Sequence, residues 1–188
     1  MFNTRASGVL MHLTSIPSRY GVGVMGDETK RFIDKIKGMG FSYWQVLPLN
    51  PPDFHGSPYT SDAAFAISHM FVSPDELVKD GLVSAEDIER SVYYGSPYTA
   101  DYEFAYSARL ELLRKAYSNA GEAIKAKAEK FADENEWCKS YSLFMAAKEK
   151  FDNKPWYEWG EDFARYENCL KNADKLKDEA DFYAFVQY

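Results

Sequence analysis

Two short apolar runs with one helix between them constrain the fold of this chain more than any other feature. Residues 7–13 and 41–47 have the length and apolar content of strands. Residues 27–39 between them carry an apolar stripe at helical spacing, with Asp27 and Glu28 at the start, where the helix dipole favours them. Because strand, helix and strand follow within about 45 residues, we predict a βαβ unit with buried, parallel strands and a right-handed crossover.

After about residue 70 the apolar spacing becomes helical. Ser73 can cap a short helix that has Pro74 in its first turn and ends at Gly81, and Ser84 can cap another over residues 84–91. The remaining helices are predicted over residues 101–119, 121–135, 136–151, 161–170 and 174–188. We therefore divide the chain into an α/β part, residues 1–70, and an α-helical part, residues 71–188.

Composition excludes several classes of function. The formal net charge of −7 disfavours nucleic acid as a partner, because phosphate binding needs clustered Lys and Arg. No run approaches the roughly 20 apolar residues of a membrane helix, and the first ten residues lack a signal-peptide pattern, so we expect a cytoplasmic protein. Cys138 and Cys169 have no metal-ligand or disulfide spacing and are predicted to be free thiols.

The second apolar run breaks into a loop, residues 48–62, that holds four prolines and several aromatic residues. Loops fixed to strands are where sites usually lie. Tyr59 after Pro58 could stack on a sugar ring and donate a hydrogen bond, or it could pack into its own loop. Asp53 and Asp62 flank the loop, and we favour turn or cap roles for them over paired catalytic carboxylates.

Residues 21–26 read GVGVMG and match the dinucleotide fingerprint GxGxxG. Residues 14–20 separate this motif from the first strand, and Asp27 and Glu28 would face the pyrophosphate. The context therefore disfavours nucleotide binding.

His12 ends the first apolar run, where a hydrogen-bonded core histidine is commoner than a catalytic one, and both interpretations stay open. His55 and His69 have no partner at ligand spacing, so we predict no metal site.

A short internal sequence repeat, which we call the echo, occurs once in each part of the chain. Residues 56–66 read GSPYTSDAAFA and residues 95–105 read GSPYTADYEFA. Structural repeats normally need 20 residues or more, so we interpret the echo as a recurring turn that leads into a helix or a loop.

The motifs together resemble the start of the amylomaltases, which are 4-α-glucanotransferases. The resemblance extends in one order over essentially the whole chain and rests on SGVLMHLTSIP (7–17), YGVG (20–23) with Gly26, WQVLPL (44–49), GSPYTS (56–61), AFA (64–66), DELV (75–78), GL (81–82), DY (101–102), YSLFMA (141–146), Pro155-Trp156 with Trp159, FY (182–183) and FVQY (185–188).

The resemblance implies a (β/α)₈ barrel that cuts an α-1,4-glucan by retaining chemistry and passes part of it to another glucan, with no metal or cofactor. A whole barrel takes roughly 250 residues. We therefore expect an N-terminal fragment: the first βαβ unit, the active-site loop 48–62, and a helical subdomain inserted after the second strand, whose last helix, about 174–188, leads back to the barrel. The family's catalytic carboxylates belong to later strands, so we expect no catalytic residue here and no activity of the isolated chain.

For binding, the resemblance places Ser57 and Tyr59 beside the sugar at the cleavage point. Phe54 stands where the family often has Tyr, and it pairs with Tyr102 in a secondary glucan site that loses one hydroxyl here. His12 is a candidate for active-site support. The partners implied are maltooligosaccharides.

Two other functions stay open. The chain could be a noncatalytic glucan-binding or interaction module, or a helical scaffold without a ligand. In addition, two parallel strands with unpaired edges favour self-association or partial disorder of residues 1–70.

Overall fold

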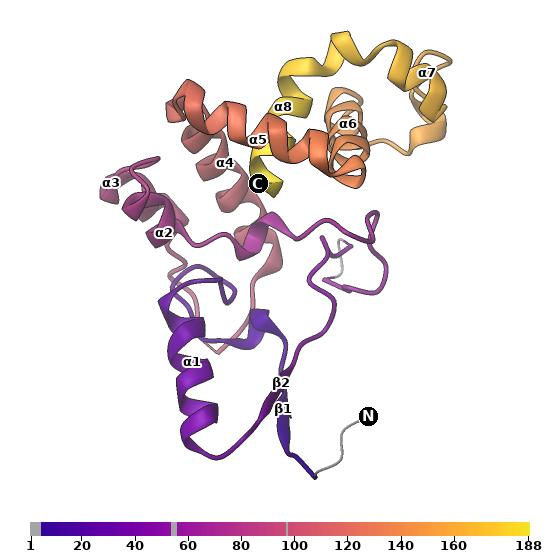
Figure 1. Cartoon of the computed structure of the whole chain (residues 1–188). Helices are drawn as coiled ribbons and strands as arrows, with labels where there is room; N and C mark the ends of the chain where they lie inside the picture. Colours follow the sequence, from indigo (N-terminus) through magenta and orange to yellow (C-terminus); the bar gives the residue numbers. More distant parts are fainter. Residues whose placement is uncertain (1–4, 54–55, 97) are drawn as a thin grey trace. The chain divides into compact units, whose positions relative to one another are not determined.

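The computed structural model describes residues 5–53, 56–96 and 98–188. The chain divides into two compact units, Met1–Asn119 and Ala120–Tyr188, which we describe separately (Figure 1). We call them unit 1 and unit 2. The border between these units lies 49 residues after residue 70, behind the helix that contains Tyr102. The border predicted at residue 70 is a different one, between a barrel and its insertion, and it stays a prediction.

Unit 1 contains two short strands and several helices. Its elements are β1 (Gly8–Leu10), the 3₁₀ turn η1 (Leu13–Ser15), α1 (Asp27–Gly38), β2 (Tyr43–Gln45), η2 (His69–Phe71), α2 (Pro74–Lys79), α3 (Ala85–Ile88), η3 (Glu89–Ser91) and α4 (Tyr102–Asn119).

Unit 2 is helical throughout its regular structure. Its elements are α5 (Glu122–Glu134), α6 (Glu136–Lys150), η4 (Trp156–Glu158), α7 (Tyr166–Lys171), η5 (Ala173–Leu176) and α8 (Lys177–Gln187).

The two strands form a parallel pair, as predicted, with Val9 opposite Trp44. Gly8 lies opposite Tyr43, and a Cβ on Gly8 would lie 2.8 Å from the Tyr43 carbonyl oxygen. Glycine is therefore required where the first strand approaches its partner.

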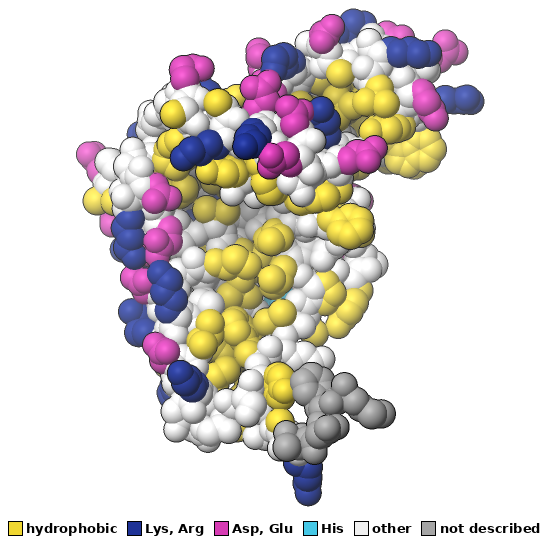
Figure 2. All heavy atoms as spheres, in the orientation of Figure 1, with side chains coloured by type: hydrophobic (Ala, Val, Ile, Leu, Met, Phe, Trp, Pro, Cys, Tyr) yellow, Lys and Arg dark blue, Asp and Glu magenta, His cyan; other side chains and the backbone are white. Residues whose placement is uncertain are grey.

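The strands are shorter and more exposed than the apolar runs predicted. Leu10 is 62% exposed and Tyr43 is 47% exposed, so the expectation of buried strands is wrong for this chain. Among the described residues each strand pairs only with the other. Hydrophobic side chains gather on the surface between α1 and the strands (Figure 2). A parallel sheet is normally covered on both faces.

The core of unit 1 lies beyond the carboxyl ends of the strands. Leu13, Ile16 and Phe71 form one buried cluster, against which Trp44 packs. The Trp44 indole N–H donates to the Met11 carbonyl over 2.8 Å. These contacts hold the two chain segments that leave the strands.

Local sequence signals at the helix starts are confirmed. The Ser73 hydroxyl accepts from the Glu76 amide, with Pro74 in the first turn, and Ser84 and Asp87 form a reciprocal capping box. Lys and Arg alternate with Asp and Glu along the face that carries α1 and α2 (Figure 2). There Lys30 bridges Asp27 of its own helix and Glu76 of α2 over 3.2 and 3.1 Å.

In unit 2, α5, α6 and α8 share a core that includes Ala132, Cys138 and Ala184. Both cysteines are buried free thiols, as predicted. The helix predicted over 161–170 is α7, which starts only at Tyr166. Gly160 has a positive φ of 76°, and the Asn168 side-chain amide donates to the Glu161 carbonyl, which holds the residues before α7 in turns.

In the part of the chain that the structure describes, no helix is long and apolar enough to cross a membrane.

Candidate functional site

The loop of residues 48–62 follows β2 and is closed at its base by two contacts. The Ser68 amide donates to the Leu49 carbonyl over 2.8 Å. The Asn50 side-chain amide donates to the Ala63 carbonyl. The loop therefore leaves the strand and returns within a fixed opening.

The carboxylate of Asp53 organises the interior of this loop. It accepts from the Ser57 amide over 2.9 Å and from the Thr60 hydroxyl over 2.5 Å. The Asp53 carbonyl also accepts from the Gly56 amide over 2.9 Å. Asp53 thus has the turn role that its position predicted, and it fixes Ser57. The turn or cap role predicted for Asp62 stays a prediction.

Tyr102, the first residue of α4, is the point where two loops meet. Gly56 has a φ of +79°, and a Cβ there would lie 3.1 Å from the Tyr102 ring, so only glycine fits without displacing the ring. The Tyr102 hydroxyl lies 3.1 Å from the Thr14 hydroxyl, and Thr14 belongs to η1, just after β1. The segments that follow both strands therefore meet on one aromatic residue.

Tyr59 is 70% exposed. This exposure is not what packing into its own loop predicts, and it leaves the ring accessible to a ligand. The Tyr59 amide donates weakly to the Ser57 hydroxyl, over 3.4 Å. Phe54 and His55 lie outside the described residues, so the predicted pairing of Phe54 with Tyr102 stays a prediction.

His12 lies one residue before η1 and is partly buried. Its ring meets Phe71 edge to face at 5.8 Å, and burial lowers the pKa of the imidazole below its ordinary value. Within the described residues, nothing hydrogen-bonds to its buried Nδ1. Burial therefore favours the neutral form of the imidazole, and the role of His12 as active-site support stays a prediction.

A small cavity of about 210 Å³ adjoins η1 in unit 1. It is lined by Thr14, Ser15, Ile16, Pro17, Ser18, Gly21, Val22, Tyr93, Ser96, Tyr98, Thr99 and Ala100. The sequence alone did not identify Thr14 and Tyr98 as candidate site residues. The signal was the echo over residues 95–105, which contains both Tyr98 and Tyr102, but the echo alone does not show what this turn contacts.

The glycines of GVGVMG allow neighbouring backbone segments to approach closely. A Cβ on Gly23 would lie 2.0 Å from the Leu13 carbonyl oxygen, and the Gly21 carbonyl accepts from the Asp101 amide over 2.9 Å. These contacts give the motif a packing role beside η1, in agreement with its context in the sequence. Among the described residues, no group of three or more His, Cys, Asp and Glu could hold a metal ion.

The structure resembles a solved carbohydrate-active enzyme. An amylomaltase from Streptococcus agalactiae, determined in complex with acarbose, superposes with a TM-score of 0.89 at 32% sequence identity, over 98% of this chain and 38% of that one. The two strands and the helices thus have the arrangement found in part of an amylomaltase.

Sequence comparison gives the same answer. The model of the family described as 4-alpha-glucanotransferase matches residues 11–188. The 4-alpha-glucanotransferases of Aquifex aeolicus and Clostridium butyricum are 39% and 34% identical, over 98% and 95% of this chain. The chain belongs to the 4-alpha-glucanotransferase family. It spans 38% and 37% of the length of these two relatives.

Proposed function

We propose that this chain is the N-terminal part of a 4-α-glucanotransferase and that loop 48–62 holds an α-1,4-glucan through Ser57 and Tyr59. The observation that carries the proposal is the meeting of Thr14, Gly56 and Tyr102, which joins the segments after both parallel strands. In barrel enzymes the active site is built from the loops at this end of the strands. The acarbose bound to the related amylomaltase supports an oligosaccharide as the ligand.

The fold proposal follows from the same arrangement. We assign β1, α1 and β2 to the first βαβ unit of a (β/α)₈ barrel, and residues 71–188 to a helical subdomain inserted after β2. The exposure of Leu10 and Tyr43 supports this assignment, because further strands and helices of a barrel would cover such side chains.

The chemistry of the loop is suited to binding. The exposed ring of Tyr59 can stack on the apolar face of a sugar, and the hydroxyl of Ser57 can exchange hydrogen bonds with the sugar's hydroxyl groups. Because Asp53 fixes the loop before the ligand arrives, little ordering entropy is lost on binding.

Bond cleavage needs other residues. Retaining transfer uses two carboxyl groups about 5 Å apart, one as nucleophile and one as acid and then base. Both carboxylate oxygens of Asp53 already accept hydrogen bonds within the loop. We therefore assign the catalytic carboxylates to the remainder of the protein and expect no transfer by the 188-residue chain alone.

The proposal can be tested with a fusion protein, in which this chain is followed by the part of the Aquifex relative that lies after the matched segment. The fusion is incubated with maltotriose. We expect glucose and longer maltodextrins from the fusion, and neither from the 188-residue chain. Products from the chain alone would contradict our assignment of the carboxylates. A fusion that folds and binds maltodextrin but never transfers would favour the noncatalytic binding module.

In the fusion, Tyr59→Ala should lower transfer severalfold or more because the stacking face is lost, whereas Tyr59→Phe should retain most of that face. Tyr94→Ala is the matched control, since Tyr94 is 85% exposed in the same unit and lies outside the loop. Initial rates of glucose release measure the effect. Equal rates for Tyr59→Ala and Tyr94→Ala would show that Tyr59 does not hold the substrate.

A further inference from the structure

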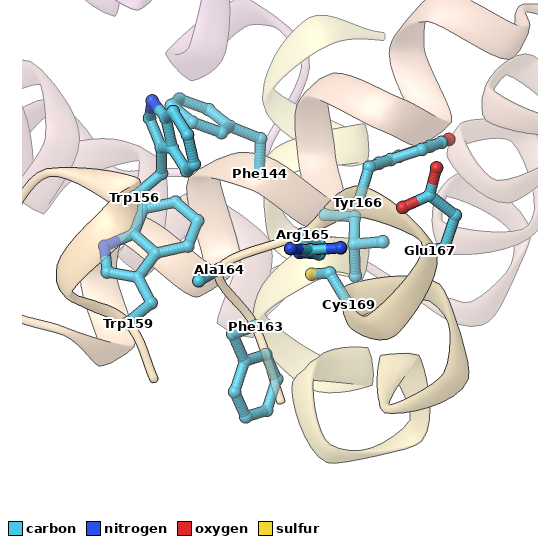
Figure 3. A pocket seen from close by; sticks show the side chains of 10 residues that line it. Phe144, Trp156, Trp159, Phe163, Ala164, Arg165, Tyr166, Glu167 and Cys169 are labelled. Atoms are coloured by element: carbon cyan, nitrogen blue, oxygen red, sulfur yellow. The ribbon is translucent and has the colours of Figure 1, made fainter. Parts of the chain in front are cut away.

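Unit 2 contains a cavity that the proposed function does not use. It has a volume of about 430 Å³, which lies within the range of small-molecule sites. Residues of α6, of the turn through η4, and of the start of α7 surround it (Figure 3). All of them belong to unit 2, so the cavity is complete within one compact unit.

Ring packing fixes one wall of this cavity. Trp159 is 4% exposed, stacks on Phe151 with centroids 5.9 Å apart and planes 9° apart, and tilts against Phe144 at 5.4 Å. Its indole N–H donates to the Lys154 carbonyl over 2.8 Å. The indole plane is therefore set before any ligand binds.

A second indole stands beside the fixed one and remains open. Trp156 is 56% exposed and lies near Trp159 and Phe144 on one side of the cavity (Figure 3). Pro155 precedes it and η4 begins with it, so its backbone is held. A large exposed ring over a cavity is a ready stacking surface.

The opposite side of the cavity is polar. Figure 3 shows Arg165, Tyr166 and Glu167 there, across from the tryptophans. All three are exposed, and the Tyr166 hydroxyl lies 2.8 Å from the Ser140 hydroxyl. Arg165 supplies donors and Glu167 supplies acceptors.

The charges of the lining identify the chemistry of the ligand. Arg165 and Glu167 are the charged lining residues and cancel each other, so the site favours neither an anion nor a cation. A purely apolar ligand would make no use of the donors of Arg165 or the acceptors of Glu167. An uncharged ligand with an apolar face and a rim of hydroxyl groups matches both walls, and a sugar ring has this form.

We propose that this cavity is a further carbohydrate site, different from loop 48–62 and from the secondary glucan site predicted at Phe54 and Tyr102. It binds a short segment of α-1,4-glucan, with Trp156 stacked on a sugar ring and Arg165 and Glu167 bonded to its hydroxyls. The choice of α-1,4-glucan among carbohydrates rests on the proposed function of the chain. The site holds glucan and performs no chemistry on it.

The test is a titration of the ¹⁵N-labelled 188-residue chain with maltopentaose, followed through the indole N–H signals of its four tryptophans. We expect saturable shifts for Trp156 and Trp159 and an unchanged signal for Trp137, which lies in the same unit but outside the cavity. Absence of shifts at Trp156 and Trp159 up to millimolar maltopentaose would overturn the proposal. So would equal shifts with cellopentaose, since the site is assigned to α-1,4-linked chains.

Variants then test the stacking surface. Trp156→Ala should raise the Kd for the site at least tenfold, while Leu170→Ala, in α7, should change it less than twofold. Leu170 is 49% exposed but does not line the cavity. Because Trp156 is largely exposed, its removal leaves the packed Trp159 in place, and the helical circular dichroism should not change. An equal loss in both variants would overturn the role of Trp156.

Tyr59→Ala separates this inference from the proposed function. The shifts of Trp156 and Trp159 should be the same in Tyr59→Ala as in the parent chain. If the cavity does not bind maltopentaose while the fusion transfers glucan in a way that depends on Tyr59, only the carbohydrate site in unit 2 is refuted. If the cavity binds maltopentaose while the fusion folds but does not transfer glucan, only the transferase assignment is refuted.

Discussion

The loop of residues 48–62 and the cavity of unit 2 each present one exposed aromatic ring, but they support it in different ways. In the loop, the carboxylate of Asp53 binds the Ser57 amide and the Thr60 hydroxyl, and Tyr59 stands on that turn. In the cavity, Trp156 packs edge to face against Tyr157 at 5.7 Å and stands beside the buried, stacked ring of Trp159. Polar contacts position the first ring and apolar packing positions the second, so the two regions should respond differently to mutation and pH.

The difference extends to the two units. Unit 1 brings backbone segments so close together that particular glycines are required, and all three histidines of the chain lie in it. Unit 2 packs ordinary helices through small and aromatic side chains. Three perturbations test this contrast.

Gly23→Ala should have the largest effect. A Cβ at this position would lie 2.0 Å from the Leu13 carbonyl oxygen, and both groups belong to rigid backbone. We expect a loss of about 4 kcal/mol or more in the free energy of unfolding. Gly121→Ala in unit 2 is the control, because no atom lies within 4 Å of the added Cβ, and it should cost less than about 1 kcal/mol. Urea unfolding measures both, and similar losses would refute the contrast.

His69 should make unit 1 sensitive to acid. Its ring is buried, and desolvation lowers the pKa of His69 to about 4, with Arg109 adding to the effect, while Nε2 lies 3.2 Å from the Tyr106 carbonyl. In the unfolded chain His69 takes up its proton near pH 6.5, whereas in the folded chain it stays neutral down to about pH 4. The free energy of unfolding therefore keeps its full value above pH 6.5 and decreases as the pH falls from 6.5 to about 4. The loss amounts to about 3 kcal/mol.

The measurement is the difference in urea stability between the parent chain and His69→Gln at pH 7 and pH 4. The carboxylates of both proteins titrate alike, so the difference isolates His69. We expect the parent to lose more stability than the variant between these pH values. A ring-proton titration that gives His69 a pKa near 6.5 would contradict this prediction.

Asp53→Ala should have the smallest and most local effect. The Ser57 amide loses its acceptor, so its hydrogen exchange should become about 10 to 100 times faster, while the cores of both units remain protected. Asp53→Asn retains one acceptor oxygen and should show a smaller increase. Amide exchange followed by NMR measures the change. Unaltered exchange at Ser57 in Asp53→Ala would show that the loop does not depend on this carboxylate.

The sequence predicted features that depend on neighbouring residues. The caps Ser73 and Ser84, the start of α1 at Asp27 and the turn role of Asp53 follow from local hydrogen bonding, and the structure confirms them. The parallel pairing of the strands followed from the length of the segment between them.

The sequence did not predict features that depend on distant contacts. The apolar content of residues 7–13 and 41–47 predicted buried strands, whereas burial depends on what covers them. Gly56 and Tyr102 meet across 46 residues, which no local pattern records. Trp156 and Trp159 were seen as family motifs, and only the fold shows that they line a cavity with Arg165.

A crystal structure of the fusion with acarbose would show whether the loop after β2 holds the glucan. We predict a sugar ring stacked within about 4 Å of the Tyr59 ring and a hydrogen bond of about 2.8 Å between a sugar hydroxyl and Ser57. A bound oligosaccharide that contacts neither Ser57 nor Tyr59 would show that the loop does not hold the glucan.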